Sequence, residues 1–436
     1  MQLLIRRGRV IDPGRIDATM DILIKNGVIA TLSPEPIPAI EAAGMHVIDA
    51  SGKIVTPGLI DMHVHFREPG HEYKETIETG SWAAAAGGFT AVCTMPNTVP
   101  VNDNRQVTES ILEKAEKAGG IRVYPVAAIS FGLKGEALTE FGDLKEGGAV
   151  AVSDDGRPVA NSRLMRRALE YARGFGLPVI SHCEDPDLSQ GGAMNEGETA
   201  TRLGLAGIPN AAESIMVMRE IALCELTCAP VHIAHVSALE SVRVIREAKM
   251  RGLPVTAETA PHYFTLTETA VNNYNTHAKM NPPLRSEKDR QAILEGLADG
   301  TIDVIATDHA PHSSIEKEVE FDQAANGIIG LETSLCLGLK LVDSGILSLE
   351  KLIQKMALNP ARILGIDHRI KTGNPADVTM IDPEKTYVID SKCFRSKSRN
   401  TPFDGWEVKG KAVCTIVGGK IVFSDFNTQR IHLEKA

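Results

Sequence analysis

The sequence has no hydrophobic run long enough to cross a membrane and no excess of positive charge. No apolar run reaches 18 residues, so we expect no membrane-spanning helix. The formal net charge is −10, whereas a general nucleic-acid-binding protein needs a basic face. Residues 1–8 lack the long apolar stretch and small-residue cleavage site of a signal peptide, which favours a cytoplasmic protein.

Common cofactor and disulfide signatures are also missing. There is no GxGxxG and no Walker-type loop, so nothing predicts nucleotide chemistry. The seven cysteines include no CxxC pair, which favours reduced and mostly buried thiols. What remains is an ordinary globular composition, with 43% hydrophobic residues in a chain of 436, enough for a large core and more than one average domain.

Strand and helix patterns alternate through the middle of the chain. The apolar segments that predict strands are 54–61, 88–96, 122–130, 149–154, 178–183, 231–236, 254–260 and 301–307. Helical patterns lie between them at 104–118, 162–173, 210–226, 238–251 and 287–299, with Asn210, Ser237 and Ser286 as N-cap candidates. Eight strand–helix units in series favour an α/β fold of the (β/α)8 TIM-barrel type over an open doubly wound sheet.

Both ends of the chain are short and β-rich. Strand-like segments lie in residues 1–55 and 366–436, with a hairpin signal at Gly418-Gly419. Neither end has enough apolar residues for a core of its own. We therefore expect the two ends to form one small β-sandwich domain beside a catalytic barrel at 56–365.

Asp61, His63 and His65 are spaced two residues apart where the first predicted barrel strand ends. Side chains at alternate strand positions share a face, so the two imidazoles can bind one metal ion. Asp61 lies one pleat deeper and is expected to orient the site. Arg67, two residues further on, offers a planar fork for a substrate carboxylate.

Metal-capable side chains recur at the ends of the other predicted strands, where the active groups of such a barrel lie. They are Asp154, Asp155, His182, His235, His262 and Asp308. At least four histidines and two aspartates exceed what one tetrahedral zinc ion needs, which favours two metal ions sharing a carboxylate and a hydroxide. Asp308 is then placed to bind metal and to pass the proton of water to a leaving nitrogen.

Several neighbouring residues are not assigned by periodicity alone. Strand alternation does not choose between Asp154 and Asp155, and His262 fits a core position as well as a supporting one. His232 is expected to be packed, because His235 is nearer the strand end, and His309 should face away from Asp308's side. The histidines without such a context, expected at the surface or in loops, are His46, His71, His277, His368 and His432.

Taken together, these residues resemble the dihydroorotase family of the amidohydrolase superfamily, in its long bacterial type. Segments 61–70 and 306–312 are similar to its two signatures. Further family segments resemble 95–98, 153–156, 181–184, 234–237 and 280–285. The resemblance spans nearly the whole chain, and this set of motifs is far more specific than a bare HxH.

The resemblance implies a cyclic amidohydrolase that interconverts N-carbamoyl-L-aspartate and (S)-dihydroorotate in pyrimidine (UMP) biosynthesis. It implies two zinc ions per chain, bridged by Asp155 and a hydroxide, with Asp308 as catalytic acid/base and a ligand of the first zinc. The other implied ligands are His63 and His65 for the first zinc and His182 and His235 for the second. The implied substrate contacts are His65, Arg67, Asn97, Asn281, His312, Asn326 and Gly327. Ala325-Asn326-Gly327 departs from the Pro-Phe-Gly of the family, which leaves backbone groups to serve at position 326.

Other functions are possible within and outside this enzyme class. Hydantoinases, dihydropyrimidinases and allantoinases share the barrel and the HxH, but Arg67 and Asp154-Asp155-Gly156 favour dihydroorotase. An inactive scaffold for aspartate transcarbamoylase would lack the metal ligands, which are present here. The sequence leaves open whether an active enzyme also binds the transcarbamoylase. We expect a small-molecule substrate, a homo-oligomer in the form of a dimer, and neither nucleic acid nor membrane as partner.

Overall fold

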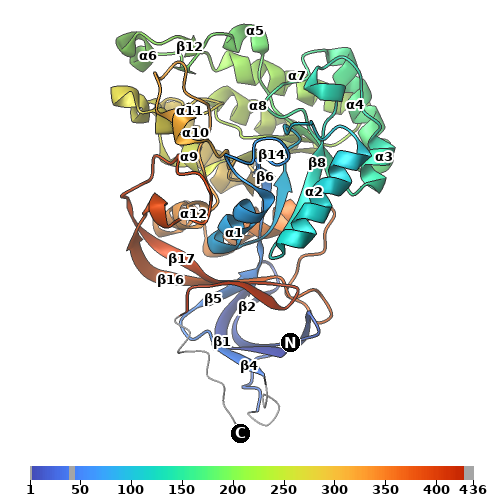
Figure 1. Cartoon of the computed structure of the whole chain (residues 1–436), viewed down its shortest axis with the longest axis vertical. Coiled ribbons are helices and arrows are strands. Elements are labelled where there is room, and N and C mark those ends of the chain that lie inside the picture. The colour runs from blue at the N-terminus through green and yellow to red at the C-terminus, as the bar shows by residue number, and fades with distance from the viewer. Residues whose placement is uncertain (1, 39–44, 427–436) are drawn as a thin grey trace.

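A computed structural model describes residues 2–38 and 45–426 and divides them between a barrel and a separate sheet (Figure 1). The barrel strands pair in parallel in the order β15-β14-β13-β10-β9-β8-β7-β6. A bridge between Val64 and His309 brings the two edges together, so the barrel is nearly closed. The predicted (β/α)8 fold is therefore confirmed. The strands are β6 (Leu59–Val64), β7 (Phe89–Thr94), β8 (Arg122–Ala127), β9 (Ala151–Val152), β10 (Val179–Ser181), β13 (Val231–Ile233), β14 (Val255–Thr259) and β15 (Val304–Ile305).

Helices lie around the outside of the barrel strands (Figure 1). The longer ones are α1 (Ile77–Gly87), α2 (Arg105–Ala118), α3 (Phe141–Glu146), α4 (Ser162–Phe175), α7 (Ala211–Thr227), α8 (Leu239–Met250), α10 (Glu287–Asp299) and α12 (Ser334–Asp343). Short elements lie between them or close the barrel: α5 (Pro186–Ser189), β11 (Met194–Asn195), α6 (Glu198–Leu203), β12 (Gly207–Ile208), α9 (Pro261–Thr265), α11 (Ser314–Lys317), α13 (Leu349–Ile353), the π-helix η4 (Gln354–Leu358) and α14 (Asn359–Ile363). The helices predicted from periodicity are confirmed to within two residues at each end.

The N-cap predictions have mixed outcomes. Ser286 caps α10 in a capping box with Asp289, as predicted. Ser237 is not the N-cap of α8, because the helix begins after Ala238 and the Ser237 hydroxyl donates to Glu213. Asn210 stands at the cap position of α7, but its side-chain amide donates to other residues instead of accepting from the helix.

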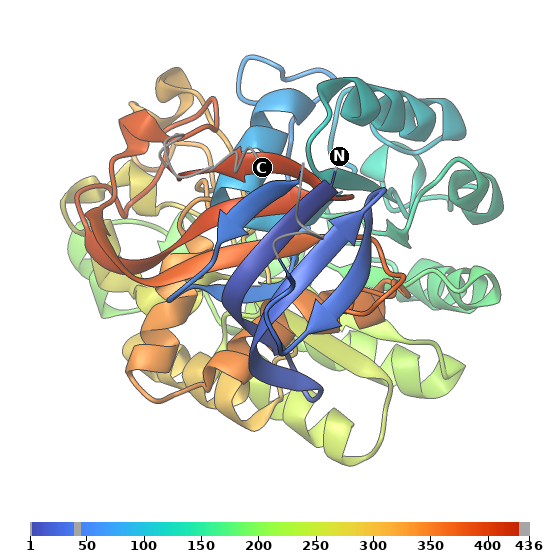
Figure 2. The ribbon, with the colours of Figure 1, turned by 90° about the horizontal axis from the view of Figure 1, so that it is seen from below.

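The two ends of the chain meet in one eight-stranded sheet, where Figure 2 shows first and last strands side by side. Its order is β18-β17-β16-β5-β1-β2-β3, with β4 paired to β1. The early strands are β1 (Gln2–Asp12), β2 (Ile16–Lys25), β3 (Val28–Ser33), β4 (His46–Asp49) and β5 (Ile54–Pro57). The late strands are β16 (Val378–Val388), β17 (Glu407–Val417) and β18 (Lys420–Ser424), with the predicted Gly-Gly hairpin between the last two. A small β-rich unit built from both ends is confirmed.

The segment predicted as one strand at 54–61 is two strands in different sheets. Residues Ile54–Pro57 pair with β1 and β16, and the chain enters the barrel only at Leu59. Gly58 lies between them, and a Cβ there would collide with the side chain of Thr90. The Pro57-Gly58 pair was the sequence signal for this break.

Apolar side chains fill the interior of the barrel below the carboxyl ends of its strands. They are Met62, Cys93, Met95, Val126, Ala151, Ile180, Ala234, Val304 and Ala306. A larger apolar layer packs the helices onto the outside of the strands. Polar side chains at the strand ends therefore lie next to a closely packed apolar layer, which restricts their movement.

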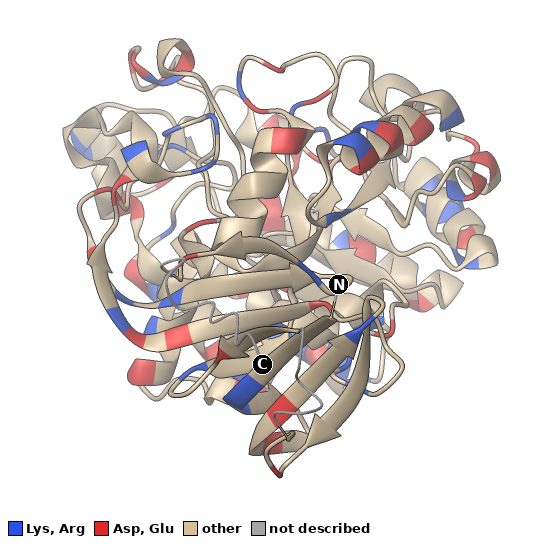
Figure 3. Ribbon diagram, turned by 60° about the horizontal axis from the view of Figure 1, so that its bottom comes forward, with Lys and Arg blue, Asp and Glu red and all other residues tan. Residues whose placement is uncertain are grey.

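The charged residues and the cysteines are distributed as in an ordinary globular protein. Acidic and basic residues are interspersed along the ribbon in the view of Figure 3. Five cysteines are buried as expected, but Cys228 and Cys393 are exposed. In the part of the chain that the structure describes, no helix has the length and hydropathy of a membrane span.

Candidate active site

Two overlapping groups of metal-capable side chains lie at the carboxyl ends of the barrel strands. His63, His65 and Asp155 form one group, and Asp155, His182 and His235 form the other. Within each group the ligand atoms lie within 4.8 Å of one another, and every residue is buried. Asp155 belongs to both groups, which is the arrangement a bridging carboxylate needs.

Asp155 faces all four histidines. Its Oδ1 lies 3.2 Å from His63 Nε2, 3.4 Å from His182 Nδ1 and 3.5 Å from His235 Nε2. Its Oδ2 lies 3.5 Å from His65 Nε2. Asp155, and not Asp154, is therefore the aspartate that faces the histidines, a choice that strand periodicity left open.

Asp154 has a different set of contacts. Its carboxylate accepts hydrogen bonds from the backbone N–H of Ser130, at 3.0 Å, and from the Ser130 hydroxyl. Burial raises the pKa of Asp154 to about 6, against the opposing effect of those hydrogen bonds. Asp154 therefore holds the loop after β8 and does not join the histidine cluster.

The cluster fits a divalent cation. His63 Nε2 and Asp155 Oδ1 are buried and have no hydrogen-bond partner among the described residues. Burial opposes protonation of His63, but Asp155 and Glu258 raise its pKa well above the usual value, so the cluster favours a positive charge. Imidazole nitrogens with a shared carboxylate are a donor set that suits zinc and similar ions.

Asp308 lies beside the first group of ligands. Its Oδ1 is 3.2 Å from His65 Nε2 and 3.7 Å from His63 Nε2. Burial raises the pKa of Asp308, but the neighbouring histidines outweigh burial and lower it overall. Asp308 is thus an ionised carboxylate at neutral pH.

Three residues of this region have a left-handed backbone that non-glycine residues seldom adopt. They are Arg67, with φ of 62°, His235, with φ of 34°, and Asp308, with φ of 50°. Such backbone strain is concentrated at functional sites, where the surrounding structure enforces it. Here it orients side chains that leave the ends of three different strands.

Glu258 supports His63, a role that was not predicted from the sequence. Its carboxylate is 1% exposed and lies 2.7 Å from His63 Nδ1 and 3.2 Å from His232 Nε2. His232 is packed as predicted, and its other nitrogen lies 2.8 Å from Thr256 Oγ1. A carboxylate on Nδ1 fixes the ring so that Nε2 faces the cluster. The sequence signal was a glutamate at the end of a barrel strand.

Glu184 makes the corresponding contact on the other side. Its Oε2 is 2.9 Å from His182 Nε2 and accepts a hydrogen bond from Asn281 Nδ2 at 3.0 Å. Burial raises the pKa of Glu184, but the hydrogen bond and charge of His182, together with the hydrogen bond from Asn281, outweigh burial and lower the pKa to about 2. Glu184 thereby links a candidate metal ligand to a candidate substrate contact.

The candidate substrate residues line one cavity of about 210 Å³ next to the cluster. Its lining includes every residue for which a substrate contact was predicted: His65, Arg67, Asn97, Asn281, His312, Asn326 and Gly327. His312 Nε2 lies 2.7 Å from the Asn326 carbonyl, so position 326 contacts its neighbours through the backbone. Burial lowers the pKa of Arg67 to about 10, which leaves it charged at neutral pH.

The remaining histidines and Asp61 lie outside the cluster. Asp61 accepts hydrogen bonds from the backbone N–H of His63 and Thr307, at 3.0 and 3.1 Å, as expected of an orienting residue. His309 faces away from the cluster, with Nε2 at 3.4 Å from Glu75. His262 is buried and its pKa is lowered to about 4, by burial above all. His46, His71, His277 and His368 are strand, loop or short-helix residues that neither belong to the cluster nor line the cavity, and His432 lies outside the described residues.

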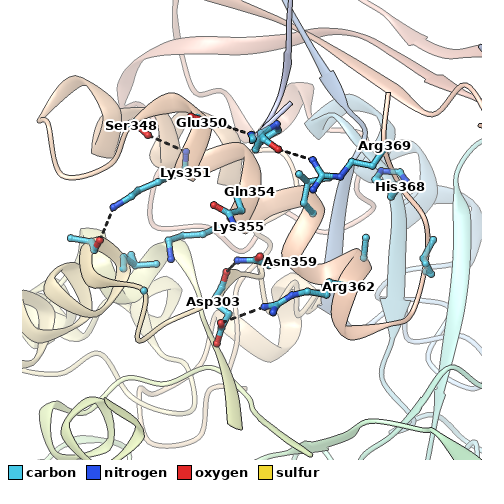
Figure 4. Close-up of a pocket in the computed structure, with 18 of the residues that line it drawn as sticks. Asp303, Ser348, Glu350, Lys351, Gln354, Lys355, Asn359, Arg362, His368 and Arg369 are labelled. Atoms are coloured by element: carbon cyan, nitrogen blue, oxygen red, sulfur yellow. Dashed lines mark hydrogen bonds and ion pairs between the residues drawn. The ribbon is translucent and has the colours of Figure 1, made fainter. Parts of the chain in front are cut away.

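A larger cavity, of about 940 Å³, lies at the opposite end of the barrel, near the amino end of β15 (Figure 4). Several of its charged groups have partners within the protein. Arg362 lies 3.8 Å from Asp303, Arg369 lies 2.8 Å from Asp12, and Lys351 donates to a backbone carbonyl. This cavity is therefore a poorer candidate for chemistry than the smaller one beside the histidines.

Known structures show the class of fold. An L-hydantoinase (dihydropyrimidinase) from Arthrobacter aurescens has a TM-score of 0.87 and 26% identity, over 98% of this chain and 96% of its own. A dihydropyrimidinase from Brevibacillus agri has a TM-score of 0.84 and 24% identity, over 98% of this chain and 95% of its own. The protein is an amidohydrolase-type barrel.

Sequence comparisons narrow the class to one family. A family model described as dihydro-orotase-like matches residues 52–241. A dihydroorotase of Desulforapulum autotrophicum is 63% identical over 97% of this chain and 99% of its own. A dihydroorotase of Geobacter metallireducens is 59% identical over 97% of this chain and 100% of its own. The chain belongs to the dihydroorotase family and is a hydrolase of cyclic amides.

Proposed function

We propose that this enzyme interconverts (S)-dihydroorotate and N-carbamoyl-L-aspartate with two zinc ions per chain. The observation that carries the proposal is the small cavity that joins the Asp155-centred cluster to Arg67, Asn97, Asn281 and His312. Cluster and cavity together match a ring amide at one end of the substrate and a carboxylate at the other.

The proposed ligands are the residues of the two groups together with Asp308. His63 and His65 would hold the first ion, His182 and His235 the second, and Asp155 both. When bound, such a pair of ions lowers the pKa of water and polarises a carbonyl group. Glu258 and Glu184 keep the rings of His63 and His182 turned toward the cluster.

Asp308 moves the proton in the proposed reaction. In hydrolysis the oxygen of water forms a bond to the ring carbonyl carbon, and the bond from that carbon to the ring nitrogen breaks. Asp308 takes the proton of the water and gives it to the leaving nitrogen. Ring closure is the same sequence in reverse, and we propose that it is the direction used in pyrimidine biosynthesis.

The substrate is held by groups that do not react. Arg67 is fixed by a hydrogen bond from its Nε to the Pro311 carbonyl, at 3.2 Å. Its guanidinium lies beside His312, with the two nitrogens 3.4 Å apart. A guanidinium at this end of the cavity, with His312 beside it, suits a carboxylate, and Asn281 would contact the ring.

A hydantoinase-type activity is the alternative, because the structural neighbours include such enzymes. Comparing the turnover of dihydroorotate, hydantoin and allantoin on one metal-loaded sample separates the two. We expect kcat/KM for dihydroorotate to be at least about a hundredfold higher, because the site is built to pair a carboxylate that hydantoin lacks. In Arg67→Gln this preference should shrink through loss of dihydroorotate turnover alone. Equal or faster turnover of hydantoin by the parent enzyme would refute the assignment.

Three further expectations stay predictions. They are a cytoplasmic location, a homodimer, and an association with aspartate transcarbamoylase. An inactive scaffold is disfavoured, because such a protein would lack the metal-capable side chains that this chain has next to the cavity.

A further inference from the structure

The eight-stranded sheet formed by both ends of the chain, called here the chain-end sheet, has one connection that reaches the candidate active site. β16 and β17 are neighbours in that sheet, but residues 389–406 between them rise along the side of the barrel (Figure 1). Asn400 lies in this connection and is only 2% exposed. Its contacts are with the loop that follows β15, residues 306–330, called here the β15 loop.

All of the hydrogen-bonding groups of the Asn400 side chain are used by this loop. Oδ1 accepts from the backbone N–H of His312 at 3.1 Å. Nδ2 donates to the carbonyl of Ala310 at 2.9 Å and to that of Gly327 at 3.1 Å. The partners fix which side-chain atom is oxygen and which is nitrogen, since one side meets an N–H and the other two carbonyls. The backbone carbonyl of Asn400 also accepts from Ile329 N–H, at 2.9 Å.

The residues that Asn400 contacts are also the wall of the candidate substrate cavity. Ala310, His312 and Gly327 all line it. Gly327 has a left-handed backbone, and a Cβ there would lie 2.5 Å from the Cβ of Ala310, so this part of the wall is tightly fitted. A small movement of residues 310–312 or of Gly327 would therefore change the shape of the cavity at the end that Arg67 lines.

The connection that carries Asn400 is itself fixed to the barrel. The backbone N–H groups of Arg395 and Ser396 donate to Glu332, at 2.7 and 3.1 Å. The Ser396 hydroxyl donates to Glu75, and the Ser398 hydroxyl donates to the Lys74 carbonyl at 2.7 Å. Asn400 is thus held on a rigid support and not on a free loop.

A buried lysine holds the same loop from inside. Lys317 is 1% exposed, and its Nζ donates to the carbonyls of Ala325 at 2.7 Å, Gly327 at 3.1 Å and Lys279 at 3.3 Å. Gly327 therefore accepts from both Lys317 and Asn400. These side-chain contacts join the two ends of the β15 loop, together with a short parallel bridge between His309 and Ile328.

We propose that Asn400 is a positioning residue for substrate binding, which fixes His312 and Gly327 so that they receive the carboxylate end of the substrate. This deepens the proposed function and rests on it. The contacts described above that hold the β15 loop all come from this one chain. Because the loop contacts a part of the substrate that does not react, its loss weakens substrate and transition state alike and acts on KM.

The test compares Asn400→Ala and Asn400→Asp with the parent enzyme in dihydroorotate hydrolysis. Each variant should raise KM by about tenfold to a hundredfold, the range expected for misplacing one or two hydrogen bonds, with kcat within about threefold. Asn400→Asp fills the same volume but sets a carboxylate against two carbonyls, so it carries the test if Asn400→Ala does not fold. Metal content should equal that of the parent enzyme.

Asn359→Ala is the matched control. Asn359 also uses its side-chain amide to bind a backbone carbonyl, that of Asp303 at 2.7 Å, but at the opposite end of the barrel (Figure 4). It should change thermal stability without changing KM. An unchanged KM in both Asn400 variants, or a loss no different from that of the control, would overturn the proposal.

Amide hydrogen exchange tests the same proposal without a substrate. In Asn400→Ala, exchange should become at least about tenfold faster at His312, whose N–H donates to the Asn400 side chain, while the amides of β7 and β8 keep the parent rate. Unchanged exchange at His312 would refute the positioning role. A parent enzyme that does not turn over dihydroorotate, with exchange altered as expected, would instead refute the proposed function alone.

Discussion

The carboxylate of Asp308 is the group that must change its protonation in the proposed reaction. An asparagine side chain at this position would have nearly the same shape and an oxygen for the metal, but could not accept a proton. We expect Asp308→Asn to lower kcat by about 10²–10⁴-fold while the metal content is retained. Steady-state hydrolysis and metal analysis on one sample provide the measurement. Full turnover with metal bound would remove Asp308 from the mechanism.

The buried carboxylate of Glu258 acts on metal affinity through His63. A glutamine side chain in its place could accept a hydrogen bond but would lack the charge that favours a correctly turned, electron-rich imidazole. Glu258→Gln should weaken zinc binding by about 10–100-fold, measured by competition with a chelator. Glu75→Gln is the matched control, because Glu75 is equally buried and lies 3.4 Å from His309, which is outside the cluster. Equal zinc affinity in the two variants would contradict this role.

At the scale of secondary-structure elements, Glu332 joins the start of α12 to the connection 389–406. Burial raises the pKa of Glu332 from its ordinary value of 4.5 to about 7, against the hydrogen bonds from Ser396 and Arg395. The folded state therefore holds a proton that the unfolded chain releases between these two pH values. This contribution to stability is present below about pH 4.5 and lost as the pH rises to about 7.

The Glu332→Gln variant should remove that dependence, because its amide does not titrate. Denaturant unfolding of both proteins at pH 5, 6, 7 and 8 gives the measurement. The free energy of unfolding of the parent should fall relative to that of the variant between pH 5 and 7, the window bounded by the ordinary and the raised pKa. Parallel curves over this range would show that Glu332 ionises normally in the folded protein.

The elements were predictable where a single segment carries its own signal. Ser286 and the apolar spacing after it indicate α10, and the structure has that helix at Glu287–Asp299. The break at Gly58 was harder to predict, because β5 and β6 are both apolar and buried although they belong to different sheets. Ser237 failed as a cap because Glu213, 24 residues earlier, binds its hydroxyl.

At the scale of the whole molecule, parallel strands made the ligand set predictable. Their carboxyl ends meet at one end of the barrel, so His63, His182 and His235 had to lie near one another once the fold was known. Contacts from outside this repeat could not be found in the same way. Asn400 lies in a connection of the chain-end sheet, and no local pattern indicates that it contacts a loop 90 residues away.

The proposed enzyme is a metal-dependent dihydroorotase whose metal ligands and substrate contacts all come from one chain. The most direct test removes metal with a chelator, returns zinc stepwise to the chain alone, and follows dihydroorotate hydrolysis by the loss of ultraviolet absorbance. Activity should be absent from the stripped enzyme and reach its plateau at about two zinc ions per chain, with no transcarbamoylase added. Zinc bound to saturation without turnover, even after a transcarbamoylase is added, would contradict the claim and point to another cyclic amide as substrate.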